Sequence, residues 1–108
     1  MSGARGEGLR RIEKEIAGEK AAALGKAGER LEQALAETQA LAARLLDADH
    51  SQRERLIEAY TLARRRTLDA RLALLIQREA LGLRRHTTVD QQFPEPPAVT
   101  DLLRRAGR

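Results

Sequence analysis

Two long stretches of apolar residues, spaced three and four apart, constrain what this chain can fold into. One runs from about residue 9 to residue 46, and the other runs from about residue 52 to residue 81. The polar segment Asp47-Ala48-Asp49-His50-Ser51 separates them. Such spacing places apolar side chains on one face of a helix. The sequence therefore predicts an all-α fold built on a long antiparallel helical hairpin.

A hairpin of this kind has too little interior to be a good fold by itself. Two helices of about 30–38 residues are each about 45–55 Å long. The apolar residues are nearly all Leu, Ala and Ile, and Tyr60 and Phe93 are the only aromatic residues. We therefore expect the tail of the chain or a second copy to cover the surplus apolar surface. This composition is typical of helical bundles and coiled coils, and we predict a homodimer that forms a four-helix bundle.

Capping and breaking residues set the expected helix boundaries. Residues 1–8 contain three glycines and no periodicity, and we expect them to be disordered. Ser51 and Glu54 have the spacing of a capping box, which places the start of the second helix near Gln52. Beyond Gly82, a candidate helix terminator, we expect two short helices. The prediction is one helical domain over 9–108, with helices at about 9–46, 52–82, 88–93 and 98–106.

Three glycines interrupt the first predicted helix, and two interpretations of them stay open. Gly18, Gly25 and Gly28 each cost about 0.8–1 kcal/mol relative to Ala in a helix interior. They either break the helix or allow a second backbone to approach closely. An antiparallel hairpin that turns near the middle of the polar segment would place 18–28 opposite about 70–80. Small residues would then face bulky ones, which favours close packing.

The apolar face of the second helix is widest at residues 72–76, where it extends around more than half of the helix. One partner helix cannot cover this arc, so we expect Phe93 and the last short helix, or a second subunit, to lie over it. Arg78 and Glu79 have two possible roles. They would either form a recognition surface or form a hydrogen-bond network with the first helix, at Glu15, Glu19 or Lys20. The candidate interaction surface comprises Leu72, Leu75, Ile76, Gln77, Arg78, Glu79, Arg84, Arg85 and His86.

The sequence lacks the residue patterns that catalysis, metal binding or cofactor binding requires. There is no cysteine, which excludes disulfides and thiolate metal sites. Asp47, Asp49 and His50 lie together in the turn, but aspartate is simply common in turns. Ser51 is explained as a helix cap, and Ser2 is the only other serine. We therefore predict that the protein is not an enzyme and has no catalytic, metal-binding or cofactor-binding residues.

Charge is high but spread evenly along the chain. The formal net charge is +4. Residues 1–46, 47–83 and 84–108 hold 8, 7 and 5 basic residues against 7, 6 and 3 acidic residues. The longest apolar run is far shorter than the roughly 20 residues of a membrane span, so we expect a cytoplasmic protein. An alternative function, weak association with nucleic acid, would use Arg64, Arg65, Arg66, Arg84 and Arg85.

Two segments carry a resemblance to a known family. Residues 19–28 read EKAAALGKAG and residues 77–86 read QREALGLRRH. This pairing resembles a family of small uncharacterised bacterial helical proteins, in which EKA-x-x-LG-x-AG precedes QREA-x-GL-R-x-H and a short proline-led tail that ends in glycine. The resemblance covers about residues 10–107. It implies a common helical architecture with a folded tail, and it implies no activity, cofactor or partner.

By exclusion, the sequence favours a non-enzymatic structural or protein-interaction module, such as an adaptor or a small chaperone-like protein. The absence of a phosphate-binding loop, of thiolates and of aromatic stacking residues supports this choice over an enzyme or a single-strand binder. No particular partner is indicated by any motif.

Overall fold

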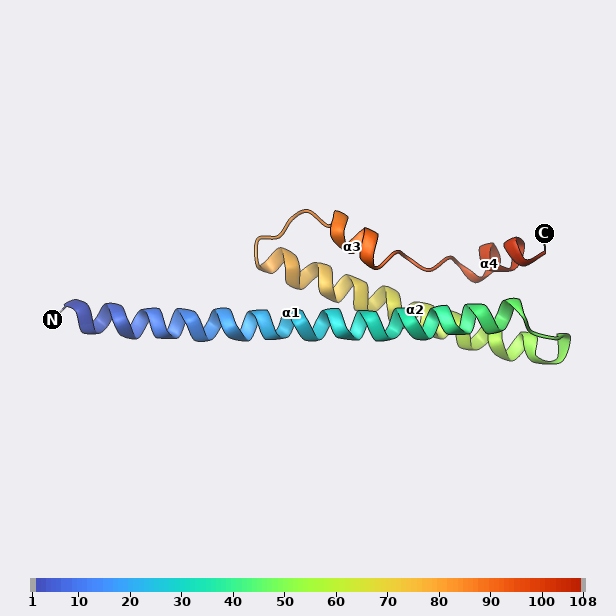
Figure 1. Ribbon diagram of the computed structural model, residues 1–108, viewed down its shortest axis with the longest axis horizontal. Helices are drawn as coiled ribbons and strands as arrows, with labels where there is room; N and C mark the ends of the chain where they lie inside the picture. Colours follow the sequence, from blue (N-terminus) through green and yellow to red (C-terminus); the bar gives the residue numbers. More distant parts are fainter. Residues whose placement is uncertain (1, 108) are drawn as a thin grey trace.

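The computed structural model describes the backbone of residues 2–107 and the side chains of residues 6–107. These residues form four helices and no strand. The two long helices pack against each other as an antiparallel hairpin, and the tail returns along α2 towards the turn (Figure 1). The predicted all-helical hairpin is confirmed. The helices are α1 (Ser2–Leu46), α2 (His50–Ala80), α3 (Thr87–Gln92) and α4 (Val99–Ala106).

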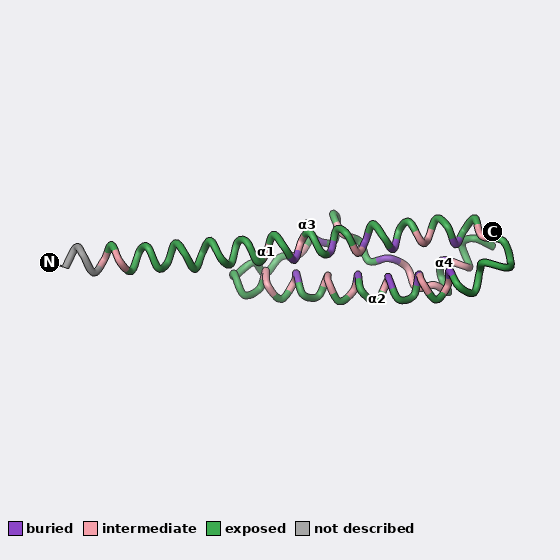
Figure 2. The backbone as a smooth tube through the Cα atoms, turned by 90° about the horizontal axis from the view of Figure 1, so that it is seen from below, coloured by how far each residue is buried: buried purple, intermediate pink, exposed green. Residues whose placement is uncertain are grey.

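The first helix is much longer than its partner, and its N-terminal part projects beyond the hairpin (Figure 2). Every residue from 9 to 23, which we call the arm, is exposed. α1 begins at Ser2, whereas the sequence predicted that residues 1–8 are disordered. Glycine lowers helix stability but, unlike proline, removes no backbone hydrogen bond, so the helix continues through this segment. Met1 lies outside the described residues.

The turn is capped by a different residue from the one that the sequence indicated. Asp49 is the N-cap of α2, and its Oδ1 accepts from the Gln52 N–H at 3.1 Å. The Ser51 hydroxyl donates to the same oxygen at 2.5 Å, so it does not cap the helix itself. This bond from Ser51 holds the pKa of the Asp49 carboxyl below its ordinary value. The predicted cap at Ser51 is therefore wrong, and α2 begins at His50, two residues early.

The register of the hairpin is pinned by two threonines. Thr38 and Thr67 are each only 1% exposed, and their hydroxyl oxygens lie 2.8 Å apart across the helix interface. A hairpin that turned symmetrically about residue 49 would instead place residue 31 opposite Thr67. The difference arises because the linking residues continue outward along α1 before α2 turns back (Figure 1). The first turn of α2 thus lies beyond the end of α1.

Two small cores lie along the hairpin, and each is completed by one short helix. Near the turn, Leu102 of α4 packs on a core of Leu45, Leu56 and Tyr60. Near the open end of the hairpin, Val89 of α3 covers a second core. That core consists of Ala27, Leu31 and Leu74, with Leu24, Ala70, Leu75 and Phe93 packed against it.

The end of α2 shows why glycine is needed there. Gly82 has φ of +83°, in the left-handed region that glycine adopts most easily. Its N–H donates to the carbonyl of Glu79 at 2.9 Å, and the Leu83 N–H donates to the carbonyl of Arg78 at 2.9 Å. These are the two hydrogen bonds of a Schellman motif, and they end the helix. The chain then reverses direction into α3.

The glycines of α1 neither break the helix nor allow close packing. α1 is continuous through Gly18, Gly25 and Gly28. Among the described residues, no neighbouring atom lies within 4 Å of where a Cβ would stand at these three positions. The interpretation that they let a second backbone come near is therefore wrong, because α2 approaches α1 mainly from Leu24 towards the turn.

We expect Gly18→Ala and Gly25→Ala each to raise the free energy of unfolding by about 0.5–1 kcal/mol. Both positions are helical and open, so the methyl group costs nothing and the unfolded chain loses entropy. Urea unfolding followed by circular dichroism measures this. The control is Gly82→Ala, which should lower the same free energy by about 1–2 kcal/mol because of its positive φ. Destabilisation by the α1 substitutions would show that these glycines do have a packing role.

A double-mutant cycle tests the threonine pair. Thr38→Val and Thr67→Val should each lower the free energy of unfolding by about 1 kcal/mol, because each removes one buried hydroxyl from the pair. The double variant should lose less free energy of unfolding than the two single variants together, by at least about 0.5 kcal/mol, because it leaves no hydroxyl without its partner. Thr61→Val is the control, since this exposed hydroxyl bonds only to its own helix at the Ile57 carbonyl. Strict additivity would contradict the pairing.

Candidate interaction surface

The tail is held along α2 by side-chain donors. Pro94, Pro96 and Pro97 have no N–H, so this segment cannot form the backbone pairing of a helix or a sheet. Its carbonyls still need donors, because unpaired buried acceptors are costly. The Tyr60 hydroxyl donates to the Pro97 carbonyl at 2.5 Å, and Arg64 Nε donates to the Pro96 carbonyl at 3.0 Å. These bonds fix the path of the tail.

Arginines seven residues apart extend this line of donors. Arg71 Nε donates to the Phe93 carbonyl at 3.4 Å, and its guanidinium pairs with Asp90 and Glu95. Arg78 Nη2 donates to the Arg85 carbonyl at 3.0 Å. Residues seven apart lie on the same face of a helix. The face that carries Arg64, Arg71 and Arg78 is therefore committed to holding the chain's own tail.

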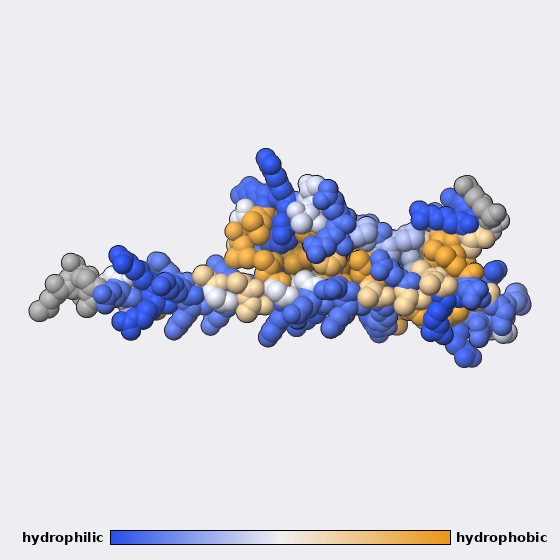
Figure 3. Space-filling view, viewed as in Figure 1, coloured by the Kyte–Doolittle hydropathy of each residue, from blue (hydrophilic) through white to orange (hydrophobic). Residues whose placement is uncertain are grey.

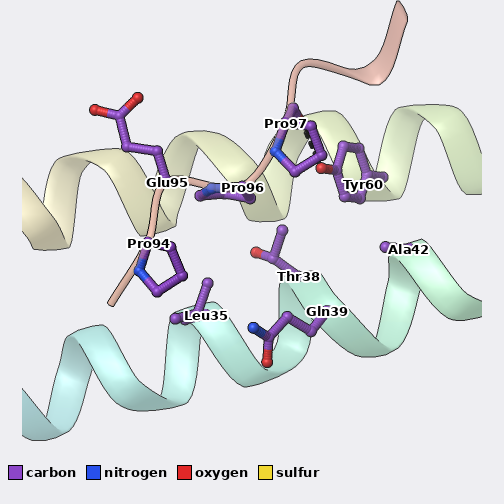
Figure 4. Close-up of a pocket in the computed structure, with 9 residues that line it drawn as sticks. All are labelled: Leu35, Thr38, Gln39, Ala42, Tyr60, Pro94, Glu95, Pro96 and Pro97. Carbon is purple, nitrogen blue, oxygen red and sulfur yellow. Dashed lines mark hydrogen bonds between the residues drawn. The ribbon is translucent and has the colours of Figure 1, made fainter. Parts of the chain in front are cut away.

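A small pocket lies where this tail crosses the hairpin (Figure 4). Its volume is about 140 Å³, below the roughly 300 Å³ of a typical ligand site. Tyr60 and Thr38 line it, but both hydroxyls already have partners. The pocket is therefore a packing gap beneath the prolines rather than a ligand site. Its remaining lining residues are Leu35, Gln39, Ala42, Pro94, Glu95, Pro96 and Pro97.

The polar residues predicted at the open end do come together, but not with α1. Arg78 Nε lies 3.4 Å from Nδ1 of His86, and Nε2 of His86 lies 3.1 Å from Oε1 of Glu79. The expected bonds from Arg78 and Glu79 to Glu15, Glu19 or Lys20 do not form. The register set by Thr38 and Thr67 places Arg78 at the level of Ala27, and both side chains bond to the segment after α2 instead. This network fixes the chain as it leaves the Schellman motif, while Arg84 and Arg85 are exposed.

The apolar part of the predicted surface is divided. Leu75 packs against the open-end core, whereas Leu72 and Ile76 are exposed on the outer side of α2. Gln77 is half-buried and lines a groove at the open end. Phe93 lies over part of this region, as expected, but α4 packs at the turn instead. On the face seen in Figure 3, apolar side chains gather around the end of α2 and α3.

The arm carries the first part of the apolar face predicted for residues 9–46, and this part is exposed. Leu9, Ile12 and Ile16 are 60%, 53% and 45% exposed, and we call them the arm stripe. A groove of about 430 Å³ continues from this stripe to the end of α2. Its lining residues are Glu13, Ile16, Ala17, Lys20, Ala21, Leu24 and Leu81. The unequal lengths of the two predicted helices were the signal that could have identified this surface.

A second, smaller groove lies between the two long helices at the same end. It has a volume of about 200 Å³ and we call it the open-end groove. Its apolar part comes from Ala23 on α1, from Ala80 at the end of α2 and from Leu81 directly after it, with Lys20 and Gln77 at its edges. Together, the arm stripe and the open-end groove form an apolar surface that extends across both helices.

Acidic side chains and histidines do not gather into a metal site in the described part of the chain. No three of them lie close enough together to share an ion. Asp47, Asp49 and His50 remain a turn, in which Asp49 serves as the helix cap. Within residues 2–107, no helix is both long enough and apolar enough to cross a bilayer.

Comparisons with known proteins add no relative. No family model, no curated protein and no solved structure matches this chain. The resemblance of residues 19–28 and 77–86 to a bacterial family therefore stays a prediction, and function has to be argued from the structure.

Tyr60 makes the tail sensitive to alkaline pH. Burial raises the pKa of its phenol above the ordinary value of 10.0, although Arg64 and Arg105 act in the opposite direction. Unfolded chains therefore lose this proton first as the pH rises, and the free energy of unfolding should fall above about pH 10.

The measurement is urea unfolding between neutral and alkaline pH, compared with Tyr60→Phe. At neutral pH, the free energy of unfolding of the variant should be about 1 kcal/mol lower than that of the wild type, because the Pro97 carbonyl loses its donor. It should also lack the part of the alkaline decline that comes from this phenol. An equal alkaline decline in both proteins would contradict the assignment.

Proposed function

We propose that this chain is a non-enzymatic cytoplasmic interaction module, an adaptor or chaperone-like protein that binds other protein chains through the open end of its hairpin. One observation carries the proposal: the arm stripe of Leu9, Ile12 and Ile16 is exposed although it runs along the helix that builds both cores. A contiguous apolar face beside a groove marks an interaction surface more often than a free surface.

The form of the surface supports a helical partner. The stripe follows helical spacing along a straight helix (Figure 1), and the groove beside it is open and elongated. An amphipathic helix would bury its own apolar face there by the same i, i+3, i+4 pattern. The homodimer and the dimeric four-helix bundle predicted from the sequence are one form of this binding.

Association with nucleic acid is less well supported. Arg64 is used to hold the tail, and Arg66 lies 4.0 Å from Glu37. Of the five arginines in that hypothesis, four are exposed, and they are divided between α2 and the segment that follows it: Arg65, Arg66, Arg84 and Arg85. Exposed arginines that are not clustered on one face give a weak electrostatic footprint for phosphates.

Site-specific photo-crosslinking in cells tests the proposed function. A photoreactive residue replacing Ile16 should capture a protein partner, because this side chain lies in the exposed stripe. The same residue at Lys14 is the matched control, since side chains two residues apart point to nearly opposite sides of a helix. Mass spectrometry then identifies the captured chain, which can include a second copy. Equal capture at positions 14 and 16, or none at 16, would contradict the proposal.

A further inference from the structure

We propose that the partner of the arm is a second copy of this chain, bound antiparallel, with Ile16 of both copies on the two-fold axis. Leu9 of each arm then enters the open-end groove of the other copy. This inference rests on the proposed function and names the partner and the register of the same surface. It moves the dimer interface from residues 72–76 of α2 to the arm.

The arm continues an interface that the chain already has. The row of apolar side chains that α1 buries against α2 runs through Leu24, Ala27 and Leu31. It continues into the arm without a break in the helix, but α2 ends at Ala80 and leaves it uncovered. The missing cover is therefore a helix that begins where α2 stops. The chain itself contains such a helix in the arm.

The side of the hairpin that the second copy would occupy is open. The tail lies on the side of α1 that presents Gln39, where Gln92 and Phe93 line a common depression. The Glu37–Arg66 ion pair lies exposed on the other side. At about 100° per residue, Ile12 points within about 20° of Glu37 and nearly opposite Gln39. A helix on the arm stripe therefore meets the open-end groove without meeting the tail.

The arm is complementary to itself. With Ile16 on the axis, the residue numbers of two positions that face each other add up to 32. Leu9 therefore lies opposite Ala23 of the second copy. Bulky Leu9 thus meets the small side chains Ala23 and Ala80 in the open-end groove. Ile12 lies along the aliphatic part of Lys20. Self-complementary contacts of this kind close into a dimer.

Charge supports the same register. Lys20 of the second copy lies opposite Ile12, which is next to Glu13. Glu13 of each arm can therefore form an ion pair with Lys20 of the other arm. Both residues flank the arm stripe, and both line the groove of about 430 Å³ beside it. Opposite charges at flanking positions fix the register and orientation of paired helices. The ends of the two α2 helices then lie on either side of the paired arms, and four helices meet at the centre of the dimer.

Sedimentation equilibrium on the full chain tests the partner. The wild-type protein should associate to twice its 12.0 kDa mass at micromolar concentration. Ile16→Glu should weaken the dimer at least about a hundredfold, because two carboxylates would meet on the axis. It should leave the two cores of the hairpin folded, since Ile16 is exposed in the single chain and belongs to neither core. Ile76→Glu is the matched control on the outer side of α2 and should leave the dimer intact.

Two further variants test the register. Glu13→Lys should weaken the dimer about tenfold, and Glu13→Lys combined with Lys20→Glu should restore it. Because the chain has no cysteine, Ile16→Cys should form an intermolecular disulfide readily on mild oxidation, and Ile76→Cys should not.

A monomeric wild-type protein would overturn the inference, and so would a dimer that Ile76→Glu disrupts and Ile16→Glu does not. The proposed function is tested separately. Capture of a different protein at position 16 by a chain that is monomeric would support an interaction module while rejecting the second copy as its partner.

Discussion

The fold depends on how α2 satisfies the backbone of the tail. Three prolines deprive this segment of N–H groups, so it cannot pair with itself or with a helix, and its carbonyls need donors from elsewhere. Tyr60, Arg64 and Arg71 supply them. Once the tail is fixed along α2, Val89 and Leu102 reach the hairpin and complete its two cores. Helices as short as α3 and α4 have little stability of their own, so these contacts are what stabilise them.

The spacing of apolar residues was sufficient to predict the hairpin, and Gly82 marked the end of α2. The donors that hold the tail were not predicted. Arg64 and Arg71 have the spacing of any solvated helix face, and their acceptors are backbone carbonyls more than twenty residues away in sequence. Side-chain identity contains no information about such carbonyls. Which carbonyl each arginine bonds becomes clear only when the path of the tail along α2 is known.

The turn shows how a local ambiguity shifts contacts across the whole hairpin. Asp49 and Ser51 are both good helix caps and lie two residues apart, so sequence alone does not decide between them. With Asp49 as the cap, the linking residues run outward and α2 is displaced along α1. Thr38 therefore meets Thr67, and Leu31 rather than Leu24 takes the position opposite Leu74. The same displacement makes α2 end at the level of Leu24, about seven residues short of the level that a symmetric turn would reach, and so lengthens the uncovered arm.

The uncovered arm also has a thermodynamic consequence. A single helix of this length gains little from its own backbone hydrogen bonds, and Gly18 weakens it further. Its helicity must therefore be linked to whatever binds along it, in the way that ligand binding is linked to folding. The helix content of this protein should rise with occupancy of the arm, so circular dichroism alone would report association.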